Sequence, residues 1–248
     1  MLENASYIGL TRQIALQRKL DIVANNIANV NTAGFKRDMP LFEEYIMPNA
    51  RMTSFKPNDQ KLSYVNDSGL YRDFSQGDLQ KTGAELDVAI SGPGWFVVQT
   101  PDGERYTRNG HFHRNDEGAL VTSEGHAVMG EGGPITIGIA DTNIAITEDA
   151  TITTNLGDRG RFRIVDFNNK NQLKKEGASY YSSTDAPVPG TQARTMQGIV
   201  EKSNVKPVLQ LTEMIQTTRA YISTTRMIQQ AHELRQGAIS RLGGAQQN

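Results

Sequence analysis

Apolar positions near the start of the chain recur with the spacing of a helix. One row repeats every seven residues, and two further positions follow members of that row by four residues. These positions are Leu2, Gly9, Leu16, Val23 and Val30, with Leu20 and Ile27. The stripe predicts an amphipathic helix. We expect this helix to end at residues 31–34, because Gly34 can adopt the left-handed conformation that closes a helix.

A second stripe lies near the end of the chain. One of its rows has a spacing of seven residues and another row lies beside it. The first row is Met214, Tyr221 and Ile228, and the second is Leu211, Ile215 and Ile222. The pattern predicts a second amphipathic helix. Ser203 or Asn204 is expected to cap its start, which places Pro207 in the first turn, where the missing N–H breaks no helical hydrogen bond.

The middle of the chain alternates short β-prone runs with turns that contain glycine, which supplies the positive φ of tight hairpins. Strands are expected at residues 86–90, 95–100, 104–108, 119–122 and 161–167. Their apolar side chains are expected to form a separate core, with Leu86, Val88, Ile90, Trp95, Phe96, Val97 and Val98. Two long amphipathic helices beside such a domain must bury their stripes elsewhere, so pairing of the helices and packing between copies are the leading options.

The sequence therefore predicts an α+β fold, in which N- and C-terminal helices pair as a coiled-coil-like unit and a central all-β domain lies between them in the chain. Residues 41–69 show neither a helical nor a strand period. The expected segments are an N-terminal helix at 1–34, an extended connector at 35–69, a β-rich domain at 70–195 and a C-terminal helix at 196–248.

Composition narrows the chemistry. The 248 residues carry a net charge of −1, which separates into +2 over residues 1–40, −6 over 41–195 and +3 over 196–248. Neither end has a clustered Lys/Arg run, so we expect no nucleic-acid partner. No window approaches the roughly 20 apolar residues of a membrane span, so no membrane insertion is expected. The absence of cysteine excludes disulfides and thiolate chemistry.

Four asparagines crowd the end of the first predicted helix, at positions 25, 26, 29 and 31. Asparagine is a mediocre helix former, so the cluster is consistent with a fraying last turn or with solvent-facing polar positions. Alternatively, Asn25 and Asn29 lie four residues apart beside the apolar stripe, where their amides could bond to a neighbouring helix and set its register. Spacing alone leaves both interpretations open.

Candidate catalytic and binding residues are few. His111 and His113 alternate on a predicted strand, but two histidines without a third ligand are a weak sign of a metal site. Residues 91–95 are rich in glycine, yet a strand follows where a phosphate loop needs a helix. Nothing positions Asp87 or Asp102 against a nucleophile. We therefore expect no catalytic, cofactor or metal site.

Three blocks of sequence resemble bacterial flagellar rod and hook proteins, in the same order and spacing. The first covers residues 20–37, the second residues 77–83, 86–90, 95–98 and 106–110, and the third residues 201–205 and 214–221. The length of the chain suits a rod subunit better than a hook subunit. Within the family, residues 71–79 and 132–135 favour a proximal-rod subunit, with a distal-rod subunit as the alternative.

The resemblance implies a structural role without catalysis or a cofactor. Rod subunits stack helically into a hollow drive shaft that crosses the periplasm, and the flagellar type III apparatus exports them without a cleaved signal peptide. Their partners are copies of themselves and other rod proteins. A β-rich enzyme or binding module is the remaining alternative. The residues expected at the assembly interface are Leu16, Leu20, Val23, Asn25, Asn26, Ile27, Asn29, Val30, Asn204, Leu211, Met214, Ile215, Tyr221, Ile222 and Ile228.

Overall fold

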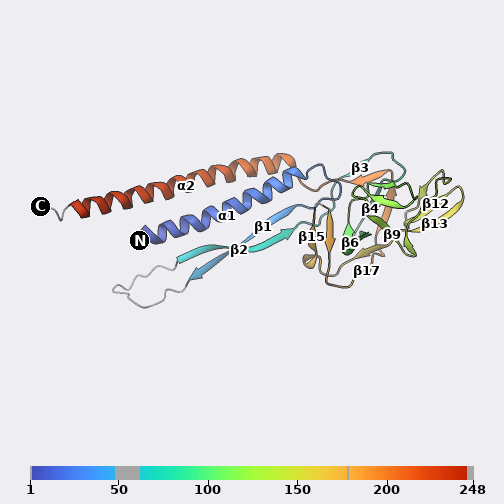
Figure 1. Ribbon diagram of the computed structural model, residues 1–248, viewed down its shortest axis with the longest axis horizontal. Coiled ribbons are helices and arrows are strands. Elements are labelled where there is room, and N and C mark those ends of the chain that lie inside the picture. Colours follow the sequence, from blue (N-terminus) through green and yellow to red (C-terminus); the bar gives the residue numbers. More distant parts are fainter. Residues whose placement is uncertain (1, 48–61, 178, 245–248) are drawn as a thin grey trace. The chain divides into compact units, whose positions relative to one another are not determined.

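The computed structural model of the chain describes residues 2–47, 62–177 and 179–244. The chain divides into two compact units, drawn in Figure 1. The helical unit comprises Met1–Ile27, Asp38–Tyr71 and Pro207–Asn248, and the β unit comprises Ala28–Arg37 and Arg72–Lys206. The predicted α+β fold, with a helix at each end of the chain and a β-rich middle, is confirmed.

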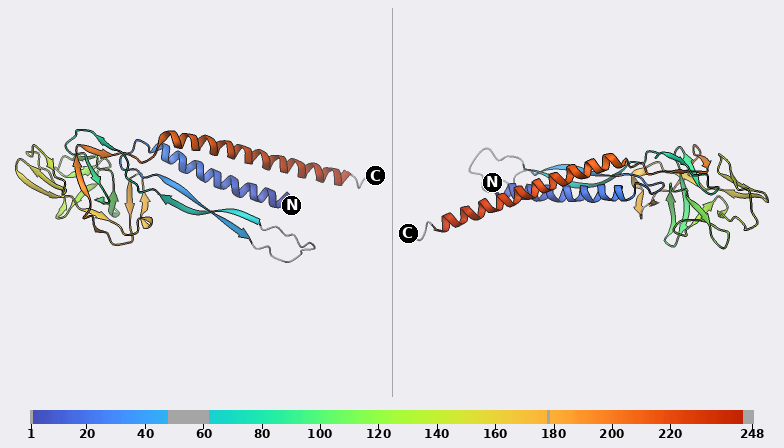
Figure 2. Two further views of the ribbon diagram at one scale, coloured as in Figure 1. Left: turned by 180° about the vertical axis from the view of Figure 1, so that it is seen from behind. Right: turned by 90° about the horizontal axis from the view of Figure 1, so that it is seen from above.

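The helical unit pairs two antiparallel helices, α1 (Leu2–Ala28) and α2 (Pro207–Gly244), which lie side by side in Figures 1 and 2. Early in α1, a Cβ on Gly9 would lie 2.9 Å from Cγ1 of Ile228. Near its end, Asn26 Nδ2 donates to Gln210 Oε1 at 3.1 Å. In the described part of the chain, no helix is both long and apolar enough to cross a membrane.

The face of α2 that meets α1 is polar at half of its positions. Both of its rows have a spacing of seven residues: Gln210, Thr217 and Thr224 are buried, and Met214, Tyr221 and Ile228 are half-buried. Gln13 Nε2 of α1 donates to the Tyr221 hydroxyl at 3.1 Å. This seam therefore buries less apolar surface than two leucine-rich helices would.

Both predicted helix boundaries need correction. The helix α1 ends at Ala28, although the apolar stripe continues to Val30, and Gly34 has a φ of 69° in a turn beyond the helix. The helix α2 begins at Pro207, so neither Ser203 nor Asn204 caps it. Both side chains have other partners: the Ser203 hydroxyl accepts from the backbone N–H of Val205, and the Asn204 amide bonds to Arg37, Asp73 and Ser75.

The segment expected to be an extended connector contains two strands that its sequence pattern did not indicate. It forms β1 (Asp38–Met47) and β2 (Leu62–Arg72), which pair as a two-stranded sheet and run in opposite directions in Figure 1. Asn26 ties β1 to α1, because its amide accepts from Asp38 N at 3.0 Å and donates to Asp38 O at 2.8 Å.

The largest sheet of the β unit has ten strands among the described residues. Its main path is β15-β16-β6-β5-β9-β8-β7, while β10 pairs with β9 and β14 pairs with β5 and β17. The strands are β5 (Trp95–Thr100), β6 (Gly103–Thr107), β7 (Phe112–Arg114), β8 (Leu120–Thr122), β9 (Ala127–Gly130), β10 (Gly133–Pro134), β14 (Ile164–Asp166), β15 (Lys174–Glu176), β16 (Tyr180–Ser182) and β17 (Val188–Pro189).

Smaller sheets complete the β unit. They are the three-stranded sheet β11 (Ala145–Ile146), β12 (Thr151–Thr154) and β13 (Gly157–Arg161), and the pairs β4 (Val88–Ser91) with β18 (Arg194–Gln197) and β3 (Leu79–Lys81) with β19 (Ile199–Glu201). One short 3-10 helix covers Lys170–Gln172. The strand expected at 161–167 is wrong as a single element, because the chain leaves β13 at Arg161 and joins another sheet as β14.

Alternating side chains of β5 reach two hydrophobic cores. Phe96 and Val98 pack with the larger cluster, which includes Val88 and Ile90. Trp95 and Val97 pack on the opposite face with a second cluster, which includes Tyr181, Phe167 and Leu173. Because neighbouring residues of a strand point to opposite faces, β5 is buried on both sides. The predicted core residues are all buried except Leu86, which is partly buried at its edge.

The β unit is expected to lose stability in acid. A hydrogen bond from Arg159 holds the pKa of the Asp141 carboxyl below its ordinary value, and the Thr147 hydroxyl does the same for Asp149. A carboxyl group whose pKa is lower in the folded chain than in the unfolded chain stabilises the folded state at pH values above its unfolded pKa, which is about 3.9 for aspartate. This stabilisation is lost as the pH falls through the pKa of the folded state.

Urea unfolding followed by Trp95 fluorescence from pH 6 to pH 3 measures this loss. The free energy of unfolding should decline most steeply below about pH 4. In an Asp141→Asn variant the decline should be shallower. A flat profile across this range would contradict the assignment.

Candidate functional site

The residues that follow α1 lead into a buried polar cluster of the β unit. Gly34 N donates to the backbone oxygen of Glu201 at 2.8 Å, and Phe35 is fully buried, with Lys175 Nζ 4.0 Å from its ring centroid. A Cβ on Gly34 would lie 2.3 Å from the backbone nitrogen of Asn109. Glycine is required here for this close approach as well as for the positive φ.

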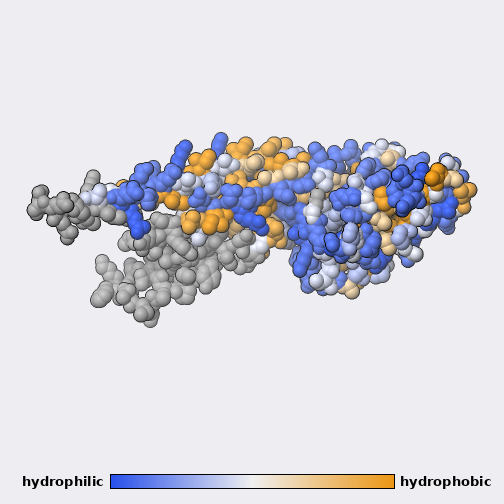
Figure 3. Space-filling view, viewed as in Figure 1, coloured by the Kyte–Doolittle hydropathy of each residue, from blue (hydrophilic) through white to orange (hydrophobic). Residues whose placement is uncertain are grey.

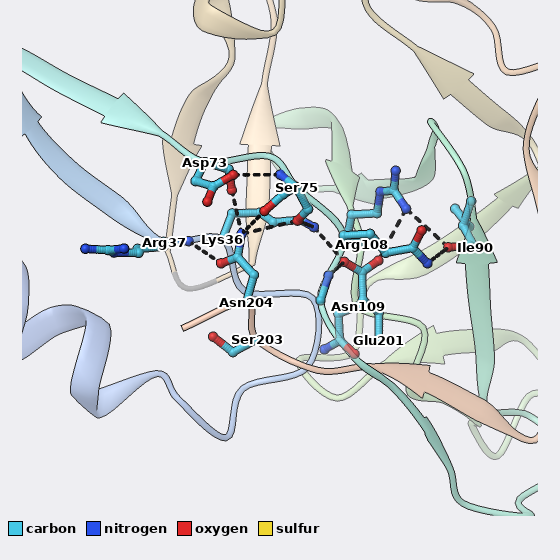
Figure 4. A network of polar contacts seen from close by, with 12 residues as sticks. Lys36, Arg37, Asp73, Ser75, Ile90, Arg108, Asn109, Glu201, Ser203 and Asn204 are labelled. Atoms are coloured by element: carbon cyan, nitrogen blue, oxygen red, sulfur yellow. Dashed lines mark hydrogen bonds and ion pairs between the residues drawn. The ribbon is translucent and has the colours of Figure 1, made fainter. Parts of the chain in front are cut away.

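Three charged side chains meet at the centre of the cluster, which is drawn in Figure 4. Lys36 Nζ lies 2.5 Å from Glu201 Oε1, and Arg108 NH1 lies 3.2 Å from Glu201 Oε2. The Lys36 and Glu201 side chains are 1% and 0% exposed. Buried charges are tolerated when they are paired and hydrogen-bonded, and this triad satisfies both conditions.

Backbone groups add further hydrogen bonds to the triad, while Arg108 Nε is buried without a hydrogen-bond partner among the described residues. Lys36 Nζ donates to Ser75 O at 2.7 Å, and Gly77 N donates to Glu201 Oε1 at 2.9 Å. Arg108 NH2 donates to Gly92 O at 2.7 Å, and its guanidinium lies 5.5 Å from the ring centroid of Trp95. The chain's own groups therefore engage both carboxylate oxygens of Glu201.

Burial is the largest influence on the two cations. It lowers the pKa of Lys36, and the Glu201 carboxylate opposes this effect. Burial also lowers the pKa of Arg108, against the opposing effects of Glu201 and Asp166. Removal of the carboxylate would leave two cations buried without an anion between them.

Asn204 is a second centre of the same cluster. Its Oδ1 accepts from Arg37 N at 2.8 Å, and its Nδ2 donates to Asp73 O at 2.7 Å and to Ser75 O at 3.2 Å. Asp73 N in turn donates to Arg37 O at 3.0 Å. The amide thus joins three chain segments that lie far apart in the sequence (Figure 4).

Other candidate residues have local partners. His111 Nδ1 lies 2.6 Å from Oδ1 of the buried Asp87, and His113 is exposed on β7. In residues 2–47, 62–177 and 179–244, no group of three or more His, Asp or Glu side chains is placed to hold a metal ion. Residues 91–95 form the turn between β4 and β5. The polar cluster around Glu201 therefore fastens chain segments together, since its groups bond to one another.

Comparisons with known proteins match three segments of the chain to flagellar families. Residues 7–36 match the model of flagella basal body rod proteins, residues 89–154 that of the flagellar hook protein FlgE/F/G D1 domain, and residues 196–241 that of the flagellar basal body rod FlgEFG protein C-terminal region. The chain is 41% identical to the flagellar basal-body rod protein FlgF of Caulobacter vibrioides, over 98% of this chain and 99% of the relative. The chain belongs to the flagellar basal-body rod protein family.

Further relatives carry two names within the rod family. FlgF of Mesorhizobium japonicum is 31% identical over 98% of this chain and 99% of its own length. FlgG of Bacillus subtilis is 32% identical over 94% of this chain and 97% of its own length. The resemblance to flagellar rod proteins, and to FlgF in particular, is thereby confirmed.

The buried triad takes one charged residue from each segment that matches a rod-family model. Lys36 lies in the first segment, Arg108 in the second and Glu201 in the third. The three family segments are therefore joined by ion pairs as well as by the chain.

The structure separates the predicted rod-assembly residues into two groups. Those that are buried or half-buried include the α2 row facing α1 and most of the α1 stripe. They are Leu16, Leu20, Val23, Asn26, Ile27, Met214, Tyr221 and Ile228, with Asn29, Val30 and Asn204 outside the helices. The exposed group is Asn25, Leu211, Ile215 and Ile222.

Three buried residues of the site escaped the sequence prediction. Lys36, Arg108 and Glu201 lie in the blocks that resemble rod proteins, but outside both apolar stripes. Their position in those blocks, without a place in a helical pattern, was the signal that could have identified them. Of the three asparagines predicted at the assembly interface, Asn26 bonds across to α2, although the four-residue spacing that suggested bonds to a neighbouring helix is that of Asn25 and Asn29.

Proposed function

We propose that this chain is a structural subunit of the proximal flagellar rod, which assembles with copies of itself and with other rod proteins through an apolar stripe on α2. The stripe consists of Val208, Leu211, Ile215 and Ile222, which are between 44% and 74% exposed. Single exposed apolar residues are common on soluble proteins, but several of them on one face of a helix are typical of a contact surface. This stripe is the observation that supports the proposed interface.

The composition of the helix pair explains why the stripe needs a partner. The seam between α1 and α2 uses Gln210, Thr217 and Thr224, so part of the apolar surface of α2 stays outside the pair. Figure 3 shows hydrophobic residues gathered over the helices. Full burial of a leucine or isoleucine contributes about 1.5–3 kcal/mol, so packing of several against another subunit would stabilise a polymer.

The finer features of the proposal follow from family membership. The subunit would form part of the rod that crosses the periplasm, reach it through the flagellar type III export apparatus without a cleaved signal peptide, and act without catalysis. Neither nucleic acid nor membrane insertion has a role in this function. The FlgF relatives support a proximal position, and the FlgG relatives support a distal-rod subunit as the second candidate.

An Ile215→Glu variant tests the proposed interface. Ile215 is 54% exposed, so a glutamate there should leave the helical unit folded but place a charge in the stripe. We expect the variant to be at least about tenfold depleted from purified basal bodies, because a tenfold loss needs only about 1.4 kcal/mol. The measurement is immunoblotting of basal bodies from cells that express each variant as the only copy.

Gln216→Glu is the matched control, since Gln216 is exposed on α2 beside the stripe. Circular dichroism should show the same helix content for both variants. Normal incorporation of the Ile215→Glu variant would overturn the interface. Absence of the wild-type chain from basal bodies would overturn the rod function itself.

A further inference from the structure

The chain passes between its helical unit and its β unit four times: after Ile27, Arg37, Tyr71 and Lys206. Three of these passages lie within four residues of the Asn204 amide or of its bonding partners. Arg37 precedes the second passage, Asp73 follows the third, and Asn204 itself precedes the fourth. The segments that precede β1, follow β2 and precede α2 are thus hydrogen-bonded to one another inside the β unit.

We propose that the Lys36–Glu201–Arg108 triad and Asn204 form a clasp that opens and closes as a unit distinct from the two hydrophobic cores, with Asn204 as its positioning residue. In the closed state, the clasp holds together the three segments of the β unit that adjoin α1, β1, β2 and α2, which are residues 34–37, 73–77 and 201–204. In the open state, these segments separate while the β core stays folded. The clasp is a property of the single chain, separate from its role in the rod.

The chemistry of Asn204 supports the positioning role. A carboxamide offers an acceptor and two donor hydrogens, and Asn204 uses both kinds of group. Its partners are the backbone atoms Arg37 N, Asp73 O and Ser75 O and the side-chain hydroxyl of Ser75. A substitution of Asn204 leaves the three backbone atoms in the chain but removes their partner. Alanine would remove all of these bonds.

Glu201 also forms hydrogen bonds to the two segments that contain Arg37 and Asp73. Its backbone oxygen accepts from Gly34 N, and its carboxylate accepts from Lys36 Nζ and Gly77 N. Asn204 and Glu201 therefore hold residues 34–37 and 73–77 between them. Phe35 and Phe74 lie in these segments, and Phe74 packs against Trp95 and Tyr181 at the edge of the second core. The contacts that join the segments to Glu201 and Asn204 are polar.

The polar character of the contacts supports opening as a separate step. Lys36 and Asn204 hold their partners through hydrogen bonds. Segments held mainly by polar contacts open locally at lower free energy than a hydrophobic core.

Hydrogen exchange on the full-length chain, read at single amides by NMR, tests the clasp. The reporters are the N–H groups of Gly34, Arg37, Asp73 and Gly77, compared with those of β5. In Asn204→Ala we expect exchange at Arg37 and Asp73 to rise at least about tenfold, while β5 changes less than about twofold. Unchanged exchange at Arg37 and Asp73 would overturn the positioning role.

Asn115→Ala is the matched control. Asn115 also accepts backbone N–H groups, from Glu117 and Ala119, but lies away from the clasp. Its replacement should raise exchange at those two residues and leave the four reporters unchanged. An equal rise in β5 after Asn204→Ala would show that clasp and core open together, against the proposal.

The wild-type chain provides a second measurement that needs no variant. Exchange in increasing sub-denaturing guanidinium should give the four reporters one common opening free energy, below that of the β5 amides. Four unrelated values, or a value equal to that of β5, would overturn the clasp.

Discussion

Replacement of Glu201 with alanine is expected to lower the free energy of unfolding of the β unit by about 3–5 kcal/mol, because one partner of a buried ion pair is removed and the other charge stays buried. Here two cations, Lys36 and Arg108, would lose their shared carboxylate. Gly77 N would also lose its acceptor. Urea unfolding followed by fluorescence measures the effect, since Trp95 is the only tryptophan of the sequence and is buried in the β unit.

Glu148→Ala is the matched control for this prediction. Glu148 pairs with Arg194 at 2.8 Å, and both side chains are more than 70% exposed. Exposed ion pairs contribute about 0–1 kcal/mol, so the control should change the free energy of unfolding by less than about 1 kcal/mol. A Glu201→Ala variant that matched this control would show that the triad does not stabilise the β unit.

Gly34→Ala is expected to cost about 4 kcal/mol or more, or to prevent folding of the β unit, because two separate conflicts coincide at this position. The first is a φ of 69°, which an L side chain rarely adopts. The second is a Cβ 2.3 Å from Asn109 N and 2.4 Å from the carbonyl carbon of Arg108, both of them backbone atoms that a rotamer change cannot move.

Gly125→Ala separates the two conflicts. Gly125 has a φ of 85°, yet a Cβ there would meet nothing within 4 Å. It should cost only the strain of the left-handed conformation, roughly 1–2 kcal/mol. The same urea unfolding measures both variants. Equal losses for Gly34→Ala and Gly125→Ala would mean that the close approach to Asn109 is relieved at no cost.

Most elements of this fold could be predicted from the sequence because their signals are local. The seven-residue rows predict α1 and α2, and short β-prone runs between turns predict β5 and β6. The element boundaries were less predictable, because they depend on tertiary partners. Asn204 is a good N-cap residue, yet its side chain bonds to Arg37, Asp73 and Ser75, which lie more than 125 residues earlier in the sequence.

The triad could not be predicted from residue patterns, because no local rule places a lysine in the interior. Lysine is almost never fully buried unless it is paired, and its partner Glu201 is 165 residues away. The resemblance to rod proteins identified the two blocks that contain Lys36 and Glu201, but not the contact between them. The role of the predicted assembly residues in the rod stays a prediction.

The division of the triad among three family segments limits how the chain can be recombined with its relatives. Consider a chimera in which the middle of this chain, with Arg108, receives residues 1–37 and 196–248 from relatives. We expect it to fold only if the residues at positions 36 and 201 match each other and Arg108, either as charges or through a compensating apolar change. Exchange of modules between this chain and its relatives is therefore expected to be constrained at three distant positions together, although each module has its own secondary structure.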